Sequence, residues 1–99
     1  MTTIDHRKEA ENHLQSLISD VQTQPQSAAR DGFLDECGAL LVAIRAFHME
    51  GIRFRMFNVD RLISRGAVTL SDSGRQRFGE LRAELEAAGF HTRSHQAPS

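Results

Sequence analysis

The chain of 99 residues has little of several residue types that usually mark a compartment or a function. Its single cysteine cannot form an internal disulfide, so nothing indicates an oxidising compartment. Tryptophan and tyrosine are absent, which removes the usual stacking platforms for single-stranded nucleic acid. The longest apolar run, 39–44, is far shorter than the roughly 20 residues that a membrane-spanning helix needs. The first residues contain no apolar segment typical of a secretory signal. We therefore expect a cytoplasmic protein without membrane contact.

Motifs for nucleotide binding and for nucleophilic catalysis are also missing. The sequence contains no G-x-x-x-x-G-K-[ST], G-x-G-x-x-G or G-x-S-x-G. Cys37 and His48 are the only reactive pair in the apolar part of the chain, but they are eleven residues apart. Within one helix that separation is about 16 Å, so the two side chains cannot touch. We interpret Cys37 as a buried structural thiol and expect no enzymatic activity and no cofactor.

Two groups of histidines have spacings that metal sites also use. His6, Glu9 and His13 share one face of a predicted helix, and His91 and His95 are four residues apart near the C-terminus. Neither group belongs to an H-E-x-x-H or C-x-x-C motif, or to the Glu-x-x-His pair of di-iron bundles. We interpret these side chains as solvated and expect no metal.

Apolar residues recur at helical spacing in segments separated by turn signals. The first segment carries a stripe at positions 10, 14, 17, 18 and 21 and is ended by Pro25. The last has a stripe at 78, 81, 85 and 88 and is ended by Gly89. We predict a mainly α-helical bundle of three to four helices over about 4–23, 28–50, 52–65 and 72–88. We expect residues 1–90 to form one domain and residues 91–99 to form a flexible C-terminal tail.

The stretch 33–63 is the centre of this arrangement, because it holds four of the six phenylalanines and most of the large apolar residues. Its first part is apolar over most of a helix circumference, which predicts a central helix that ends at Glu50–Gly51. The residues expected on its buried face are Phe33, Cys37, Leu40, Leu41, Ile44, Phe47 and His48.

The segment 52–57, I-R-F-R-M-F, allows two interpretations. Alternation of apolar residues with arginine is typical of a strand, for which 67–70 would be the partner in a short two-stranded β element within 52–70. Ile52, Met56, Val59 and Ile63 also fit a helical stripe. We favour the helix and keep the β element as the alternative.

Charge is distributed unevenly along the chain. Residues 1–50 hold eight acidic and four basic side chains, whereas residues 51–99 hold five acidic side chains and eight arginines. The two halves can therefore pair within one chain or across a two-fold dimer. Between positions 53 and 77 six arginines face only Asp60 and Asp72, and such clusters bind phosphates well.

The order D-R-L-I-S-R-G-A-V-T-L-S-D-S-G-R-Q-R-F, residues 60–78, resembles the end of a winged-helix DNA-binding domain. In that family a helix ending in glycine leads through an extended wing to a closing helix. The resemblance covers about twenty residues, and the four between Gly66 and Ser71 leave little room for a wing. It implies, as an alternative, a transcriptional regulator with a reduced winged-helix-like C-terminal half. Its candidate phosphate or DNA contacts are Arg61, Arg65, Arg75 and Arg77.

Our main hypothesis is a small non-enzymatic regulatory, adaptor or inhibitor protein that acts by protein–protein interaction, as a homodimer. Aromatic residues next to arginine are the composition that interface hot spots favour. The predicted partner-binding residues are accordingly Arg53, Phe54, Arg55, Phe57, Arg61 and Arg65.

Overall fold

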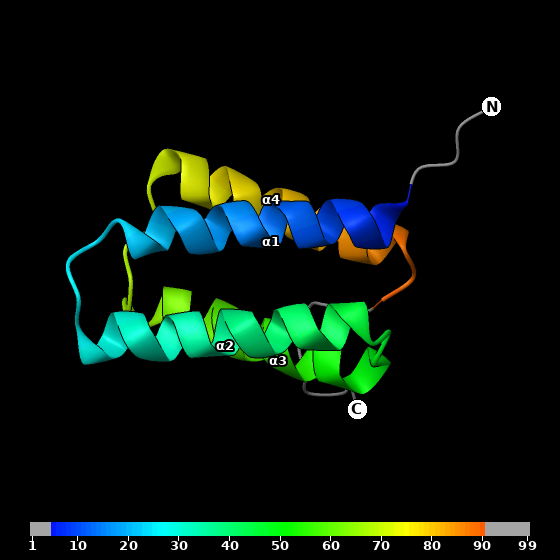
Figure 1. The fold of residues 1–99 in the computed structure, drawn as a ribbon, viewed down its shortest axis with the longest axis horizontal. Helices are drawn as coiled ribbons and strands as arrows, with labels where there is room; N and C mark the ends of the chain where they lie inside the picture. The colour runs from blue at the N-terminus through cyan, green and yellow to red at the C-terminus, as the bar shows by residue number, and fades with distance from the viewer. Residues whose placement is uncertain (1–4, 91–99) are drawn as a thin grey trace.

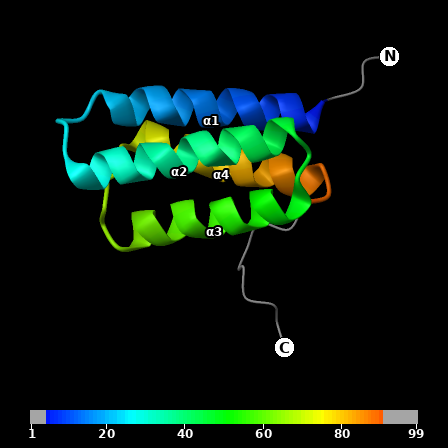
Figure 2. The same ribbon diagram turned by 60° about the horizontal axis from the view of Figure 1, so that its bottom comes forward.

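A computed structural model describes residues 5–90 of the chain. These residues form α1 (His6–Gln22), α2 (Ala28–Arg45), α3 (Met49–Ser64) and α4 (Asp72–Ala87). Figures 1 and 2 show two layers, in which α1 lies beside α4 and α2 lies beside α3. α2 also packs directly against α1. The predicted helical bundle is confirmed, and the predicted tail 91–99 lies outside the described residues. No helix within residues 5–90 is both long and apolar enough to cross a membrane.

Each helix begins at a side chain that accepts a hydrogen bond from a backbone N–H three residues ahead. Asp5 accepts from Lys8 at the start of α1, and Ser71 accepts from Gly74 at the start of α4. Ser27 opens α2 in the same way. Such caps satisfy one of the four free N–H groups of a helix start. The short polar residues of the sequence therefore determine where these three helices begin.

The boundary between α2 and α3 differs from the prediction. The expected helix over 28–50 ends at Arg45, and α3 begins at Met49, so Gly51 lies inside the first turn of α3 and terminates nothing. Phe47 takes the left-handed conformation, with φ 54°, and reverses the chain. His48 then caps α3, because its Nδ1 accepts from the Gly51 N–H at 2.8 Å. The chain turns here without a glycine or proline in the turn, which is why the sequence concealed the break.

The segment 52–57 is helical, and the β element proposed within 52–70 is not present in the described part of the chain. Ile52, Met56 and Val59 are all fully buried, which requires the helical period. Gly66 ends α3 with φ +78°, and Gly89 ends α4 with φ +99°, as their positions predicted. Residues 67–70 connect these two helices without regular secondary structure.

One hydrophobic core fills the space between the two layers. All four helices contribute fully buried side chains, and Val68, Leu70 and Phe90 close the core at its ends. The largest fully buried side chains are Phe33, Leu14, Leu17, Leu40, Ile44, Ile52, Met56, Leu81, Leu85, Val21 and Val59. Burial of a side chain of this size contributes roughly 1.5–3 kcal/mol, so these residues are the main source of the stability of the fold.

Candidate functional site

Four large apolar side chains are exposed at one end of the bundle. Val42 is 65% exposed, Phe47 58%, Met49 52% and Phe54 41%. They lie at the end of α2, in the turn that follows, and in the first half of α3. Phe47 packs against Arg7 and Phe90, whereas Val42 and Phe54 line the same groove between α2 and α3. Single exposed apolar residues are ordinary, but large ones that border one groove on a small domain mark an interaction surface. Val42 and Phe54 therefore locate the candidate site.

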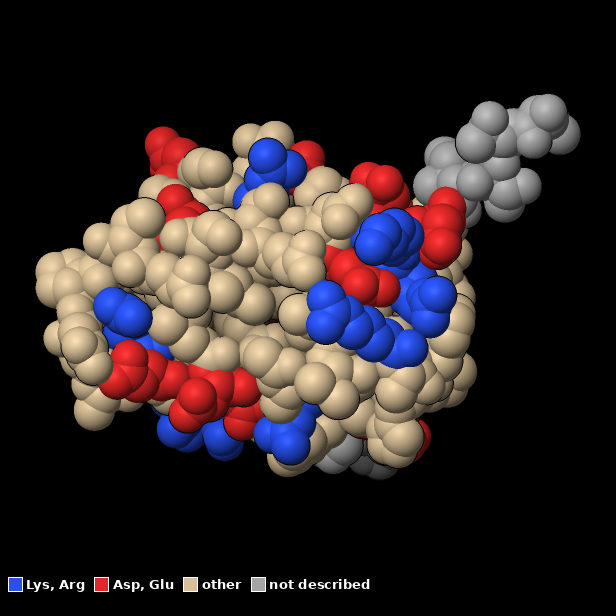
Figure 3. Space-filling model, in the orientation of Figure 1, with Lys and Arg blue, Asp and Glu red and all other residues tan. Residues whose placement is uncertain are grey.

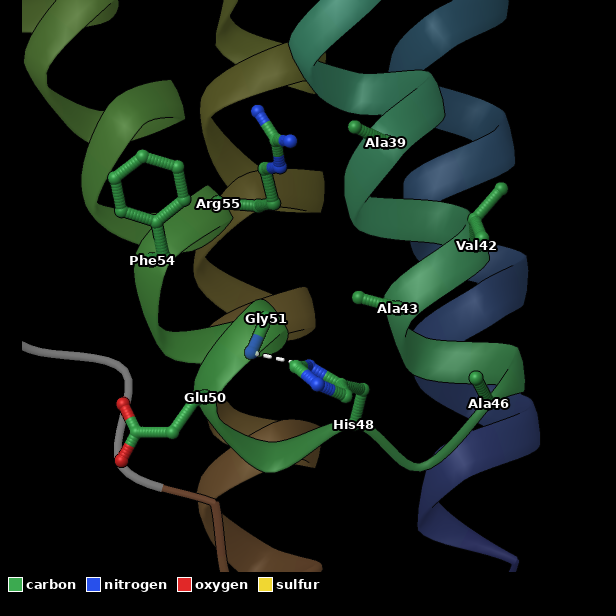
Figure 4. A pocket seen from close by; sticks show the side chains of 9 residues that line it. All are labelled: Ala39, Val42, Ala43, Ala46, His48, Glu50, Gly51, Phe54 and Arg55. Carbon is green, nitrogen blue, oxygen red and sulfur yellow. Dashed lines mark hydrogen bonds between the residues drawn. The ribbon is translucent and has the colours of Figure 1, made fainter.

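An open groove of about 780 Å³ runs between α2 and α3 at this end. Ala39 and Ala43 point from α2 toward α3, and the bond from Gly51 to His48 closes the end of the groove (Figure 4). Ala43 and Gly51 bring the two backbones close, because a Cβ added to Gly51 would lie 3.3 Å from the Ala43 Cβ. The α2/α3 groove is lined by Ala39, Val42, Ala43, Ala46, His48, Glu50, Gly51, Phe54 and Arg55.

The groove belongs to a longer surface on the side of α2 and α3 that faces away from the core. Exposed and half-buried residues recur there every three or four positions along both helices. We call this surface the outer face. Its α2 residues are Ala28, Asp31, Asp35, Ala39, Val42 and Ala46, and its α3 residues are Glu50, Phe54, Phe57, Arg61 and Arg65.

The outer face brings together most of the residues predicted to bind a partner. Phe54 and Arg55 line the groove, and Phe57, Arg61 and Arg65 follow along α3. The guanidinium carbon of Arg55 lies 5.1 Å from the ring centre of Phe54. That of Arg61 lies 5.6 Å from the ring centre of Phe57, so arginine and phenylalanine form stacked pairs.

Several arginines of the predicted cluster contact acidic side chains of the same chain. Arg55 Nη1 lies 3.1 Å from Glu36 Oε2 across the α2–α3 boundary, and the Asn58 amide also donates to Glu36. Arg53, which is half-buried and does not line the groove, lies 3.7 Å from Glu50. The acidic and basic halves of the sequence thus meet in part within one chain. Exposed pairs of this kind contribute roughly 0–1 kcal/mol each and mainly set orientation.

The four candidate phosphate contacts do not form one surface. Arg61 and Arg65 are exposed on the outer face of α3. Arg75 lies 3.7 Å from Asp72 at the start of α4, and Arg77 lies 3.3 Å from Glu80 and 3.4 Å from His13 of α1. The second pair therefore belongs to the α1–α4 layer. Residues 67–70 have no strand partner in the described residues, so they do not form a wing hairpin.

The buried face predicted for the second helix is correct in its first half only. Phe33, Cys37, Leu40 and Ile44 are fully buried, whereas Phe47 and His48 are exposed. Those two residues lie beyond the end of α2, so the helical spacing used to assign them no longer applies. The prediction also missed the exposure of Val42, because a central helix with a wide apolar face was expected to bury this side chain. Its only signal was an outer stripe at 39, 42 and 46 that is apolar where a surface would be polar.

Cys37 is not a reactive thiol in the folded chain. Burial in the core, with a smaller effect of the Glu36 carboxylate, raises the pKa of the Cys37 thiol to about 12. The thiolate, which is the nucleophile, is therefore scarce at neutral pH.

The histidines of α1 take part in packing between α1 and α4. His6 Nδ1 lies 2.6 Å from Glu84, and His13 Nδ1 lies 3.4 Å from Glu80. Within residues 5–90 no three His, Cys, Asp or Glu side chains converge in a way that could hold a metal ion. His91 and His95 lie outside the described residues.

Comparison of the chain with protein-family models, with curated protein sequences and with solved structures found no match. The functional proposal therefore rests on the geometry of the outer face.

Proposed function

We propose that this chain is a non-enzymatic protein that acts by binding another protein, as an adaptor, inhibitor or other regulatory module. The observation that carries the proposal is the α2/α3 groove with Val42 and Phe54 exposed at its edges. A folded monomer gains nothing from exposing such side chains, because each contributes roughly 1.5–3 kcal/mol when it is buried. A protein partner that covers the groove supplies that burial.

The shape of the groove favours a helix as the docked element. Its floor is made of alanines and Gly51, which leave room for the side chains of a third helix. Its walls carry Val42 on one side and Phe54 on the other, and residues of an amphipathic helix at i, i+3/i+4 and i+7 would fill the space between them. Glu50 and Arg55 stand at the rim, where charged groups set the direction of the docked helix.

Affinity capture with a matched pair of variants tests this proposal. Val42→Glu places a carboxylate at the groove, and Ala83→Glu places one on the exposed side of α4, away from the outer face. Both positions are exposed, so neither change disturbs the core. We expect wild type and Ala83→Glu to capture the same partner and Val42→Glu to lose it. A captured second copy of the chain counts as a partner. Identical capture by all three proteins would contradict the proposal.

A further inference from the structure

We infer that the outer face docks on the outer face of a second copy of this chain, in a two-fold dimer whose axis runs parallel to α2 and α3, so that α2 of each copy lies against α3 of the other. This inference rests on the proposed function, since it names the partner of the same surface. The reason for choosing a second copy is that the outer face is complementary to itself in both charge and polarity.

The two helices of the outer face are antiparallel, and three contacts show which residues lie at the same level. Ala43 lies beside Gly51 near one end. Further along, Glu36 contacts both Arg55 and Asn58. Continuing the same register places Asp31 and Asp35 of α2 level with the last two turns of α3 (Figure 2).

The outer face therefore has one charged end and one apolar end. At the charged end α2 carries Asp31 and Asp35, and α3 carries Arg61 and Arg65. Figure 3 shows a row of acidic side chains along the N-terminal half of α2, with basic side chains below it. At the apolar end α2 carries Val42 and Ala46, and α3 carries Phe54.

A two-fold axis parallel to the helices places α2 against the partner's α3 at the same level. The acidic turn of α2 then meets the basic turn of the partner's α3, and the apolar end of each helix meets the apolar end of the other. Each unit of contact occurs twice, as an isologous interface requires. Both acid–arginine pairs would be satisfied, and Glu50 at the apolar end keeps its contact with Arg53 of its own chain at 3.7 Å.

An axis that runs across the helices gives the opposite result. It places α2 on the partner's α2 in reverse, so that Asp31 and Asp35 cover the partner's Val42 and Ala46. Likewise the arginines of α3 would cover Phe54. Burial of an unpaired charge against apolar groups costs several kcal/mol, so this arrangement is excluded.

The size of the face is sufficient for a dimer that dissociates on dilution. The 18 residues of α2 extend about 27 Å, and two adjacent helices cover a strip roughly 20 Å wide. This gives about 500 Å² for each subunit and about 1,000 Å² in total, the lower limit for a specific interface. The alanines at 28, 39 and 46 let the partner's helix approach closely enough to use this area.

Sedimentation velocity over a range from low micromolar to millimolar concentration tests the inference. The variants are Asp35→Arg and Arg61→Glu. In a dimer of either variant alone, two like-charged pairs face each other across the interface. In a mixed dimer, the arginine introduced at position 35 of one chain faces the glutamate introduced at position 61 of the other. The second contact of the mixed dimer keeps the native Asp35 opposite the native Arg61, so every pair is complementary.

We expect wild type to dimerise reversibly, each variant alone to associate at least about tenfold more weakly, and an equimolar mixture to recover the wild-type affinity. Pairing within one chain cannot produce recovery on mixing. A wild type that stays monomeric, or a mixture that stays monomeric, would overturn the inference. The wild type could be monomeric while wild type and Ala83→Glu, but not Val42→Glu, capture a different protein. In that case the proposed function stands with another partner. If capture is the same for all three proteins, the function fails as well.

Discussion

At the scale of single residues, the fold depends on a few side chains whose environment differs from what their type suggests. Cys37 is fully buried in an apolar core, so its neutral form is favoured. Phe47 holds a left-handed backbone that glycine usually adopts, and its ring is 58% exposed. Both features have consequences for stability that can be measured separately.

The buried thiol of Cys37 makes stability fall at alkaline pH. The folded pKa is about 12, against 9.0 for the free thiol, so the unfolded chain releases its proton first. The contribution of Cys37 to the free energy of unfolding should be constant below pH 9 and fall above it, by up to about 1.4 kcal/mol per pH unit until the folded pKa is reached. Few other side chains titrate in this alkaline range, because the chain has no tyrosine and one lysine. Urea unfolding across this range should show the decline in wild type and a flatter profile in Cys37→Ala. Equal slopes in both proteins would contradict the assignment.

The strain at Phe47 can be separated from its contacts by two substitutions. The ring lies 4.3 Å from the guanidinium carbon of Arg7 and 6.0 Å from the ring of Phe90. Phe47→Ala and Phe47→Gly both lose these contacts, but only glycine adopts φ 54° without a steric cost. We expect Phe47→Gly to be more stable than Phe47→Ala by about 1 kcal/mol in thermal unfolding. An alanine variant as stable as the glycine variant would show that the turn relaxes.

At the scale of secondary-structure elements, α1 and α4 are joined at one end of the bundle by a hydrogen bond between side chains. Asp20 of α1 accepts a hydrogen bond from Ser71 at 2.9 Å, and Ser71 also caps α4. A Cβ added to Gly74 would lie 2.9 Å from Asp20 Oδ2, whereas one added to Gly79 would meet nothing within 4 Å. The two glycines of α4 therefore have different roles in the same helix.

Alanine substitution of these two glycines should change stability in opposite directions. Gly79→Ala should raise the free energy of unfolding by roughly 0.5–1 kcal/mol, because alanine restricts the unfolded chain and favours the helix. Gly74→Ala should lower it by about 1 kcal/mol, because the methyl group displaces Asp20 from its hydrogen bond with Ser71, the residue that caps α4. Chemical denaturation of the two variants against wild type measures both values. A stabilising Gly74→Ala would mean that Asp20 contributes nothing to the joint.

At the scale of the whole molecule, the arginines are divided between two surfaces. Arg61 and Arg65 lie on the outer face, and Arg75 and Arg77 lie in the α1–α4 layer beside acidic side chains. A duplex would have to contact both layers to use all four. The acidic row on α2 would also repel phosphates near Arg61 and Arg65.

Binding to duplex DNA of random sequence across a salt series tests the competing regulator hypothesis. We expect no binding at physiological salt in fluorescence anisotropy. A protein that uses all four arginines on phosphates would bind with a Kd of roughly 10⁻⁴–10⁻⁶ M, and its affinity would fall with a logarithmic salt slope near about −3.6. Such a slope, reduced in Arg61→Glu, would favour the DNA-binding function over the proposed one.

The sequence by itself determined the helical class, the stripe of α1, the stripe of α4 apart from the exposed Ala88, and several helix ends. These features depend on local signals: Ser71 as a cap, Pro25 as a break, and Gly66 and Gly89 as left-handed stops. Each acts within a few residues of its position, so it can be recognised without knowledge of the neighbours. The first half of the buried face of α2 was predicted for the same reason, because one helix period relates its members.

Only the tertiary structure decided the break at 46–48, the helix at 52–57 and the exposure of Val42. Alternating Ile52, Phe54 and Met56 fit a strand until packing buries the first and last of them on one side of a helix. α2 is apolar around most of its circumference, but it packs directly only against α1 and α3, so one apolar side has no neighbour in the described chain. Local pattern gives the apolar sides of a helix, and the number of neighbours determines which side stays open. That open side is the α2/α3 groove.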